Sequence, residues 1–211
     1  MKIIAINGSP RKNFNTAQLI KSASDGAKKA GAEIEIINLY DLDKYTGCIS
    51  CFGCKLGKNK GHCINRDGLT EVLEKIREAD GLILGSPNYL GDVSAQFRAL
   101  YERLIFQYIT YNKDNFSYSN RKIPVLFIMT SNGPELYDKG IVNNYKNTLS
   151  NFIGPTKVLI AGDTKQVKDY SIYEWTMFDS EHKNKRHEKE FPKKLDESFN
   201  LGVKMVEGIN K

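Results

Sequence analysis

Residues 2–16 read KIIAINGSPRKNFNT, an apolar run followed at once by a small, polar and basic loop. The apolar residues from Ile3 to Ile6 are typical of a strand that is buried on both faces of a parallel sheet. A helical pattern begins at about Thr16, so the loop joins a strand to a helix N-terminus. The N–H groups at a helix N-terminus bind anions. The loop therefore suits a phosphate site, and equally a polar turn that binds nothing.

The same alternation of short apolar runs and helical periods continues along the chain. It predicts an α/β fold with a mainly parallel sheet. Further strands are expected at 33–39, 81–85, 122–130 and 157–161, and helices at 16–30, 67–79, 92–104, 138–152 and 192–207. Asp67 and Asp92 are the expected N-caps of two of these helices. We expect a single domain over residues 1–211, with a cysteine-containing loop at 45–66 and an excursion at 163–191.

Composition and charge set the broad class. The chain has 211 residues, a formal net charge of +6 and 40% hydrophobic residues, as in an ordinary soluble domain. No apolar run approaches the roughly 18 residues of a membrane span, and the N-terminal apolar stretch is too short for a secretion signal. We therefore expect a cytoplasmic protein with no membrane partner. The basic stretch 182–189 is interpreted as a solvated helix face, because no nucleic-acid-binding module surrounds it, so no nucleic-acid partner is expected.

Two more loops match the first in composition and position. Residues 86–91 follow the third predicted strand, and residues 130–133 follow the fourth. Ligands of doubly wound sheets bind beyond the carboxyl ends of the strands, where all three loops would meet. Together the loops suit a phosphate group and a flat ring. Neither G-x-G-x-x-G nor G-x-x-x-x-G-K-[ST] occurs, which disfavours dinucleotide-binding and P-loop proteins.

These motifs resemble those of the NADPH-dependent FMN reductases, a family of flavodoxin-like proteins. The resemblance covers about residues 1–135 and rests on Gly8-Ser9-Pro10-Arg11 with Asn15-Thr16, and on Ala79-Asp80 leading to Gly85-Ser86-Pro87-Asn88-Tyr89. It implies a flavodoxin-like three-layer sandwich with a five-stranded parallel sheet in the order 2-1-3-4-5. It also implies FMN-binding residues at the strand ends: Ser9, Arg11, Asn15 and Thr16 at the phosphate; Pro87, Asn88, Tyr89, Leu90 and Gly91 beside the isoalloxazine; and Thr130, Ser131, Asn132 and Gly133 across the ring. Phe14 departs from the small residue that this family often carries in the first loop.

The resemblance implies an NAD(P)H oxidoreductase in which FMN performs the redox chemistry. The electron acceptor would be a quinone, a nitroaromatic, a flavin or a protein. No catalytic side chain is expected, and His62, His182 and His187 are assigned to the surface. Two other classes remain open. One is a flavodoxin-like electron carrier, although flavodoxins tend to be acidic; the other is a flavin-containing redox sensor that binds partners through its basic tail.

The four cysteines are clustered as Cys48-x2-Cys51-x2-Cys54 followed by Cys63. Such clustering in a cytosolic protein indicates metal or redox chemistry. The compact run favours a [4Fe–4S] cluster over zinc, which usually takes two separated pairs. It resembles the run of iron-sulfur flavoproteins, which usually have a shorter gap before the last cysteine. Free or disulfide-forming thiols are the alternative.

The excursion at 163–191 is rich in aromatic residues, namely Tyr170, Tyr173, Trp175, Phe178 and Phe191. Aromatic clusters on long connections often mark interfaces. Reductases of the resembled family are typically dimers or tetramers whose subunits complete one another's flavin sites. We therefore expect a homodimer or homotetramer in which this excursion lies near a neighbouring subunit's FMN. The alternative is that the aromatic residues fold back on their own sheet.

Overall fold

Alternate residues of the first strand are divided between two hydrophobic cores. In the computed structural model, which describes residues 1–210, Ile4 and Ile6 of β1 (Lys2–Asn7) pack in one core, while Ile3 and Ala5 pack in the other. All four side chains are buried. A strand covered on both faces belongs inside a sheet that has helices on each side.

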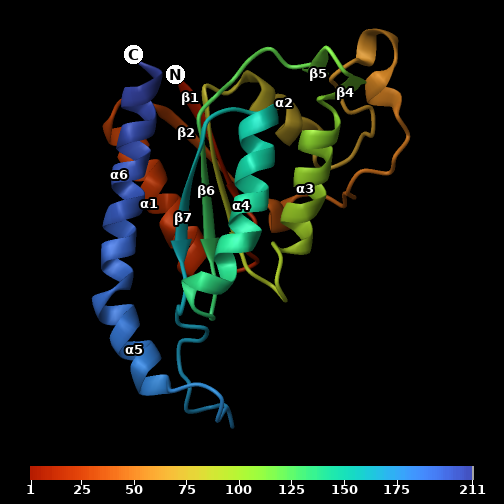
Figure 1. Ribbon diagram of the computed structural model, residues 1–211. Helices are drawn as coiled ribbons and strands as arrows, with labels where there is room; N and C mark the ends of the chain where they lie inside the picture. Colours follow the sequence, from red (N-terminus) through yellow and green to blue (C-terminus); the bar gives the residue numbers. More distant parts are fainter. Residues whose placement is uncertain (211) are drawn as a thin grey trace.

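The main sheet has five parallel strands in the order β2-β1-β3-β6-β7 (Figure 1). Its other strands are β2 (Glu33–Asn38), β3 (Gly81–Pro87), β6 (Val125–Thr130) and β7 (Thr156–Ala161). Counted within this sheet alone, the order is 2-1-3-4-5, so the predicted flavodoxin-like topology is confirmed. Because the strands are parallel, their carboxyl ends share one edge, at the bottom of Figure 1.

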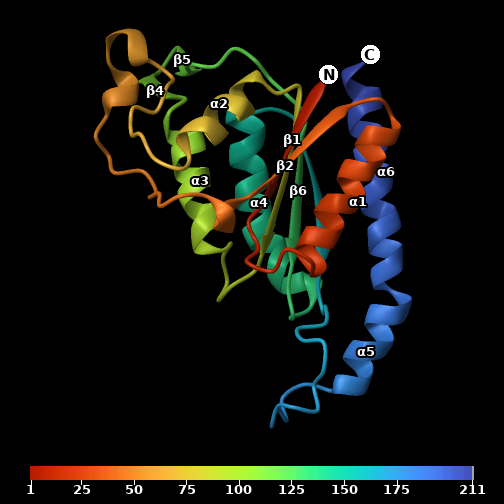
Figure 2. The ribbon, with the colours of Figure 1, turned by 180° about the vertical axis from the view of Figure 1, so that it is seen from behind.

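Helices cover both faces of the sheet, which confirms the predicted three-layer sandwich (Figures 1 and 2). One face carries α1 (Asn15–Lys29) and α6 (Phe191–Ile209), and the other carries α2 (Thr70–Glu78), α3 (Ala95–Phe106) and α4 (Glu135–Phe152). Within residues 1–210, no helix combines the length and apolar character needed to cross a membrane.

Two glycines allow α1 and α6 to approach closely. A Cβ atom on Gly26 would lie 2.0 Å from the carbonyl oxygen of Phe199, and one on Gly202 would lie 1.9 Å from that of Ala23. Only glycine avoids these backbone clashes. The close approach holds α6 along α1, although the two helices lie at opposite ends of the sequence.

The structure contains elements that the sequence patterns did not predict. β4 (Ile109–Asn112) and β5 (Asn115–Ser117) form a small antiparallel hairpin. Three short 3-10 turns follow β2 at Leu39–Asp41, Gly53–Lys55 and Gly57–Asn59. The excursion at 163–191 contains α5 (Ser180–Lys189). The predicted helix face at 182–189 lies within α5, but Lys183 on this helix is buried.

The predicted N-cap of α3 is wrong. Ser94 caps this helix, since its Oγ accepts the N–H of Phe97 at 3.3 Å. Asp92 instead bridges to the backbone of Tyr89, and its Oδ1 accepts the hydroxyl of Tyr145 at 2.6 Å. The loop after β3 thus uses Asp92 to shape its own turn, and the helix begins later than expected.

Candidate functional site

The three polar loops meet at the carboxyl edge of the sheet and line one cleft of about 270 Å³. Ten of the thirteen residues assigned to FMN by resemblance line this cleft: Ser9, Arg11, Asn15, Thr16, Pro87, Asn88, Tyr89, Thr130, Ser131 and Asn132. Among the residues described, Arg11 and Lys165 supply its charged side chains, and no acidic side chain lines it. The lining suits an anionic ligand.

The other three assigned residues lie beside the cleft. Leu90 is fully exposed, beyond Tyr89 on the second loop. The N–H of Gly91 donates to Oδ1 of Asn88 at 2.9 Å. The carbonyl oxygen of Gly133 accepts the N–H of Asp163 at 2.6 Å. Gly91 thus closes the turn of the second loop, and Gly133 links the third loop to the segment after β7.

The first loop leaves the N-terminus of α1 open. The capping position is held by Phe14, whose side chain makes no capping hydrogen bond. The loop is braced from within, because the N–H of Ser9 donates to Asn7 Oδ1 at 3.0 Å and that of Arg11 donates to Ser9 Oγ at 3.1 Å. A braced loop with uncapped helix N–H groups suits an anionic ligand.

A buried acid joins the second and third loops from behind. Oδ1 of Asp138 accepts from the Nδ2 of Asn88 at 2.7 Å, and its Oδ2 accepts from the Oγ of Ser131 at 2.5 Å. Asp138 is fully buried on α4. The sequence did not predict this role, because the position of Asp138 in the sequence does not show which loops its side chain contacts.

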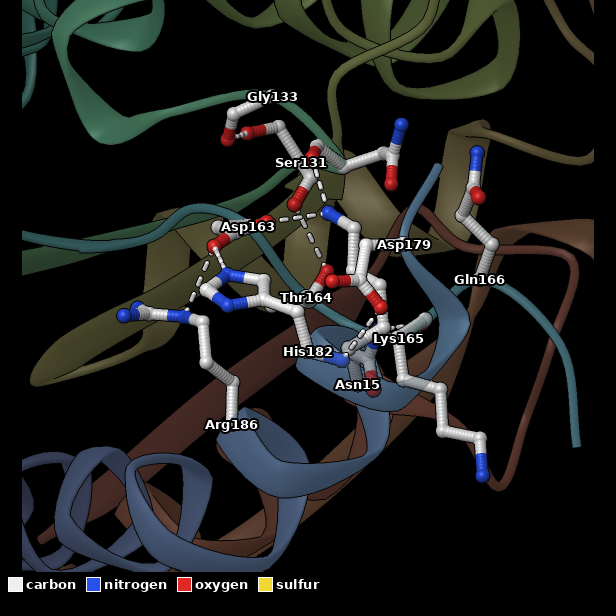
Figure 3. A network of polar contacts seen from close by, with 12 residues as sticks. Asn15, Ser131, Gly133, Asp163, Thr164, Lys165, Gln166, Asp179, His182 and Arg186 are labelled. Atoms are coloured by element: carbon white, nitrogen blue, oxygen red, sulfur yellow. Dashed lines mark hydrogen bonds and ion pairs between the residues drawn. The ribbon is translucent and has the colours of Figure 1, made fainter. Parts of the chain in front are cut away.

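A fourth wall, residues 164–167, was also missed by sequence reasoning. Asn15 donates from Nδ2 to the carbonyl oxygen of Lys165 at 2.7 Å, and Arg11 donates from Nη1 to that of Gln166. Thr164 donates from its N–H and hydroxyl to the carbonyl oxygen of Ser131, at 2.9 and 2.8 Å (Figure 3). The sequence did offer one indication that these residues line the cleft, because they follow the last strand at the same edge of the sheet.

Asp163 anchors α5 beside this wall (Figure 3). Its carboxylate contacts His182 Nε2 at 2.8 Å, Arg186 Nε at 3.0 Å, and Lys183 Nζ. Lys183 also donates from Nζ to the carbonyl oxygen of Asn132 at 2.7 Å. Burial opposes the charged form, but hydrogen bonds from Lys183 and His182 hold the pKa of Asp163 below its usual value. The contacts of these three side chains therefore fix α5 next to the third loop.

The aromatic excursion reaches the cleft of its own chain. Trp175 lines the cleft, and its ring stacks on Tyr173 with centroids 4.2 Å apart. Phe191 lies in the core formed by α1 and α6, so this residue does fold back on its own sheet. Tyr173 and Trp175 remain 40% and 44% exposed, which leaves surface for another contact.

Three buried oxygen atoms in the cleft wall have no hydrogen-bond donor among residues 1–210. They are the side-chain amide oxygens of Asn15, Asn132 and Gln166. Burying an oxygen without a donor is unfavourable. A ligand that carries hydroxyl or N–H groups would satisfy all three.

The four cysteines line a second, smaller cavity of about 20 Å³ between the 45–66 loop and α3. All are free thiols, and burial raises the pKa of Cys54. Across the described part of the chain, no three His, Cys, Asp or Glu side chains are placed to hold a single metal ion. A four-iron cluster binds its four thiols at four different iron atoms, so it needs a wider arrangement of sulfur atoms than a single ion does. The Nε of Arg103, buried in this cavity wall, lacks an acceptor in the described residues. Four thiols and a free N–H donor fit the chemistry of a cluster.

A five-stranded parallel sheet in this order, with helices on both faces and a polar cleft at its carboxyl edge, is the architecture of a flavodoxin-like protein. The chain belongs to the NADPH-dependent FMN reductase family, whose profile matches residues 1–140. The predicted family is thus confirmed.

Named relatives add detail. The chain is 44% identical over 103 residues to an iron-sulfur flavoprotein of Methanocaldococcus jannaschii, covering 49% of this chain and 51% of the relative. It is 40% identical over 105 residues to an iron-sulfur flavoprotein of Archaeoglobus fulgidus, covering 49% and 48%. The chain spans about half the length of the curated relatives it matches.

The fold is also similar to solved structures. An azoreductase from Bacillus anthracis superposes with a TM-score of 0.69 at 11% identity, covering 96% of this chain and 99% of that one. At such low identity, the likeness concerns the fold alone.

Proposed function

We propose that the chain is an FMN-dependent NAD(P)H oxidoreductase with FMN bound in the cleft. The observation that carries the proposal is the lining of that cleft: an open helix N-terminus beside Arg11, together with three buried side-chain oxygens that lack donors among the described residues. FMN carries a phosphate, ribityl hydroxyls and a ring N–H, which match these two kinds of group. When bound, FMN supplies hydride transfer from NAD(P)H and electron transfer to a quinone, nitroaromatic, flavin or protein acceptor.

In this proposal the side chains bind and orient. Ser9, Arg11 and Thr16 hold the phosphate together with the first-turn N–H groups of α1. Asn15, Asn132 and Gln166 accept from ribityl or ring donors, since all three residues line the cleft and their buried amide oxygens have no donor in the described part of the chain.

The ring would lie between the second and third loops. Tyr89 and Trp175 offer aromatic surface, and Pro87 stiffens the second loop. Leu90 and Gly91 would contact the ring only if their loop closes over it. Residues 130–133 would bound the opposite side.

The test is direct. The purified protein is expected to show flavin absorption, to release FMN on heating, and to oxidise NADH or NADPH when a quinone, a nitroaromatic or free flavin is supplied. Release of FMN without NAD(P)H oxidation by any of these acceptors would contradict the reductase and favour an electron carrier. Absence of flavin after incubation with excess FMN would contradict the cleft assignment.

A second candidate function is an iron-sulfur flavoprotein that exchanges electrons with a protein partner. The cysteine cavity favours it, because Cys48, Cys51, Cys54 and Cys63 share one pocket with a buried N–H donor. A [4Fe–4S] cluster bound there would supply one-electron transfer. Anaerobic purification with iron and sulfide analysis is the test. About four irons per chain are expected for such a cluster, and flavin without iron would remove this candidate while leaving the reductase.

A further inference from the structure

A third cavity, of about 600 Å³, lies at the amino edge of the sheet, opposite the candidate FMN cleft. It is bounded by the first residues of β6 and β7 and by the C-terminal half of α6, towards the top of Figure 1. This amino-edge cavity is larger than the cleft of about 270 Å³. Its volume falls within the roughly 300–1,000 Å³ of small-molecule sites. The proposed function does not use it.

The apolar lining of the amino-edge cavity is aliphatic. α6 contributes Leu201, Met205 and Ile209, and β6 contributes Val125 and Leu126. Leu201 and Ile209 are only partly buried, and apolar surface left in water is unfavourable. Among the described residues no aromatic side chain lines this cavity, so it offers no ring on which a flat ligand could stack. The lining therefore suits an aliphatic chain.

Basic residues surround this apolar lining. They are Arg121, Lys122, Lys157 and Lys204. One acidic residue, Asp80, lies among the described lining residues, and both of its oxygens are engaged. Its Oδ1 accepts from Arg121 Nη2 at 2.7 Å, and its Oδ2 accepts the N–H of Lys2 at 2.8 Å. The cavity therefore carries an excess of positive charge.

Lys157 and Lys204 are the cations that a ligand can reach. Both are exposed, Lys157 on the edge strand β7 and Lys204 on α6, and neither forms an ion pair with another residue of 1–210. The other two basic residues are engaged, since Arg121 pairs with Asp80 and Lys122 donates from Nζ to the carbonyl oxygen of Asn151. An anionic group beside Lys157 and Lys204 would gain charge pairing.

We propose that the amino-edge cavity binds a small anionic amphiphile, a molecule with one aliphatic chain and one anionic group. The chain contacts Leu201, Met205 and Ile209, and the anionic group pairs with Lys157 and Lys204. A second copy of the protein is a poorer occupant, because two such cavities facing one another would bring like charges together.

The first experiment is a calorimetric titration of the purified full chain with decanoate and with decanol, each below the concentration at which it aggregates. Saturable binding of decanoate is expected. The double variant Lys157→Gln and Lys204→Gln should bind decanoate about tenfold more weakly, because it removes two solvated ion pairs. Its affinity for the uncharged decanol should change less than about twofold. The control is Lys139→Gln, an exposed lysine on α4 outside the cavity, which should change neither affinity.

The second experiment narrows the cavity without changing its charge. Gly208 lines the cavity, and a Cβ atom added to it would meet no atom within 4 Å, so Gly208→Phe can place its ring there without a backbone clash. This variant should bind both decanoate and decanol about tenfold more weakly or worse.

Three outcomes would overturn the proposal. No saturable binding of decanoate, or binding that Gly208→Phe leaves unchanged, removes the site. Equal losses for decanoate and decanol in the double lysine variant remove the role of charge. If wild-type protein binds no decanoate and Gly208→Phe lowers the mass measured by light scattering, the cavity belongs to an interface between copies of the chain. None of these measurements requires that FMN bind in the cleft.

Discussion

Arg11 and Lys12 are adjacent basic residues with different surroundings. Arg11 lines the cleft and lies 4.6 Å from the centroid of Phe14, so the unusual Phe14 supports the guanidinium. Lys12 instead pairs with Asp41 at 2.5 Å.

Arg11→Ala is expected to weaken FMN binding about 10- to 100-fold, because it removes a hydrogen bond to a charged group. Lys12→Ala should change it less than about threefold, since it removes only an exposed ion pair. Fluorescence titration of apoprotein with FMN measures both, and equal losses would contradict the assignment of Arg11.

Asp163 pairs with the buried ammonium group of Lys183. Lys183 is 5% exposed and would be left buried in Asp163→Asn. Removing one partner of such a pair costs about 3 kcal/mol of unfolding free energy. Lys185→Ala, which breaks an exposed pair with Glu181, should cost less than about 1 kcal/mol. Urea unfolding at pH 7 compares the two, and similar costs would argue against a structural role for Asp163.

The same aspartate makes stability depend on pH. Its pKa is lowered in the folded protein, so its contribution is complete above the unfolded pKa of about 3.9 and is lost as pH falls through the folded value. The difference between wild type and Asp163→Asn should therefore shrink below about pH 4. Unfolding free energies measured from pH 7 down to pH 3 test this. A difference that is constant over this range would contradict it.

At the level of elements, the contact between α1 and α6 depends on glycine. Gly202→Ala places a methyl group against the backbone of α1 and is expected to cost about 1–3 kcal/mol or more. Gly208 lies on the same helix, and a methyl group added to it would have no neighbouring atom within 4 Å. Gly208→Ala should be neutral or stabilise by up to about 1 kcal/mol, because alanine favours the helix. Thermal unfolding of both variants is the measurement, and equal effects would show that the helices can separate without cost.

At the scale of the whole molecule, the excursion still presents apolar surface. Ile172 and Met177 are 72% and 86% exposed, outside the cleft lining. We propose that they contact a neighbouring subunit in a homodimer or homotetramer. In the double variant Ile172→Ser and Met177→Ser, the dissociation constant of the oligomer is expected to rise about tenfold, because the interface buries less apolar surface. Light scattering over a range of protein concentrations measures it. Phe116→Ser on the β4–β5 hairpin, 71% exposed, serves as control. An unchanged mass for the double variant would contradict the proposed interface.

Local pattern was sufficient for much of the fold and for most of the candidate cleft. The runs at Ile3–Ile6 and Gly81–Gly85 predicted strands, and the loops behind them predicted a ligand edge. Each of these signals lies within a few neighbouring residues, since strand and helix periods are short-range. The strand order came from family resemblance, because periodicity alone does not say which strands pair.

Only the tertiary structure brought together residues that are distant in the sequence. Asn15 meets the backbone of Lys165, 150 positions away, and Arg103 meets Asp67, 36 positions away. Trp175 lines the cleft of its own chain, and Asp163 pairs with Lys183 and Arg186 on α5. The sequence by itself determined the five strands of the main sheet, most of the helices that cover it and the three polar loops at the strand ends. Only the packing of helices and loops places residues 164–167 in the cleft wall and Arg103 in the wall of the cysteine cavity. The physical reason is that buried charges and polar groups need partners, and these partners come from segments that are distant in the sequence.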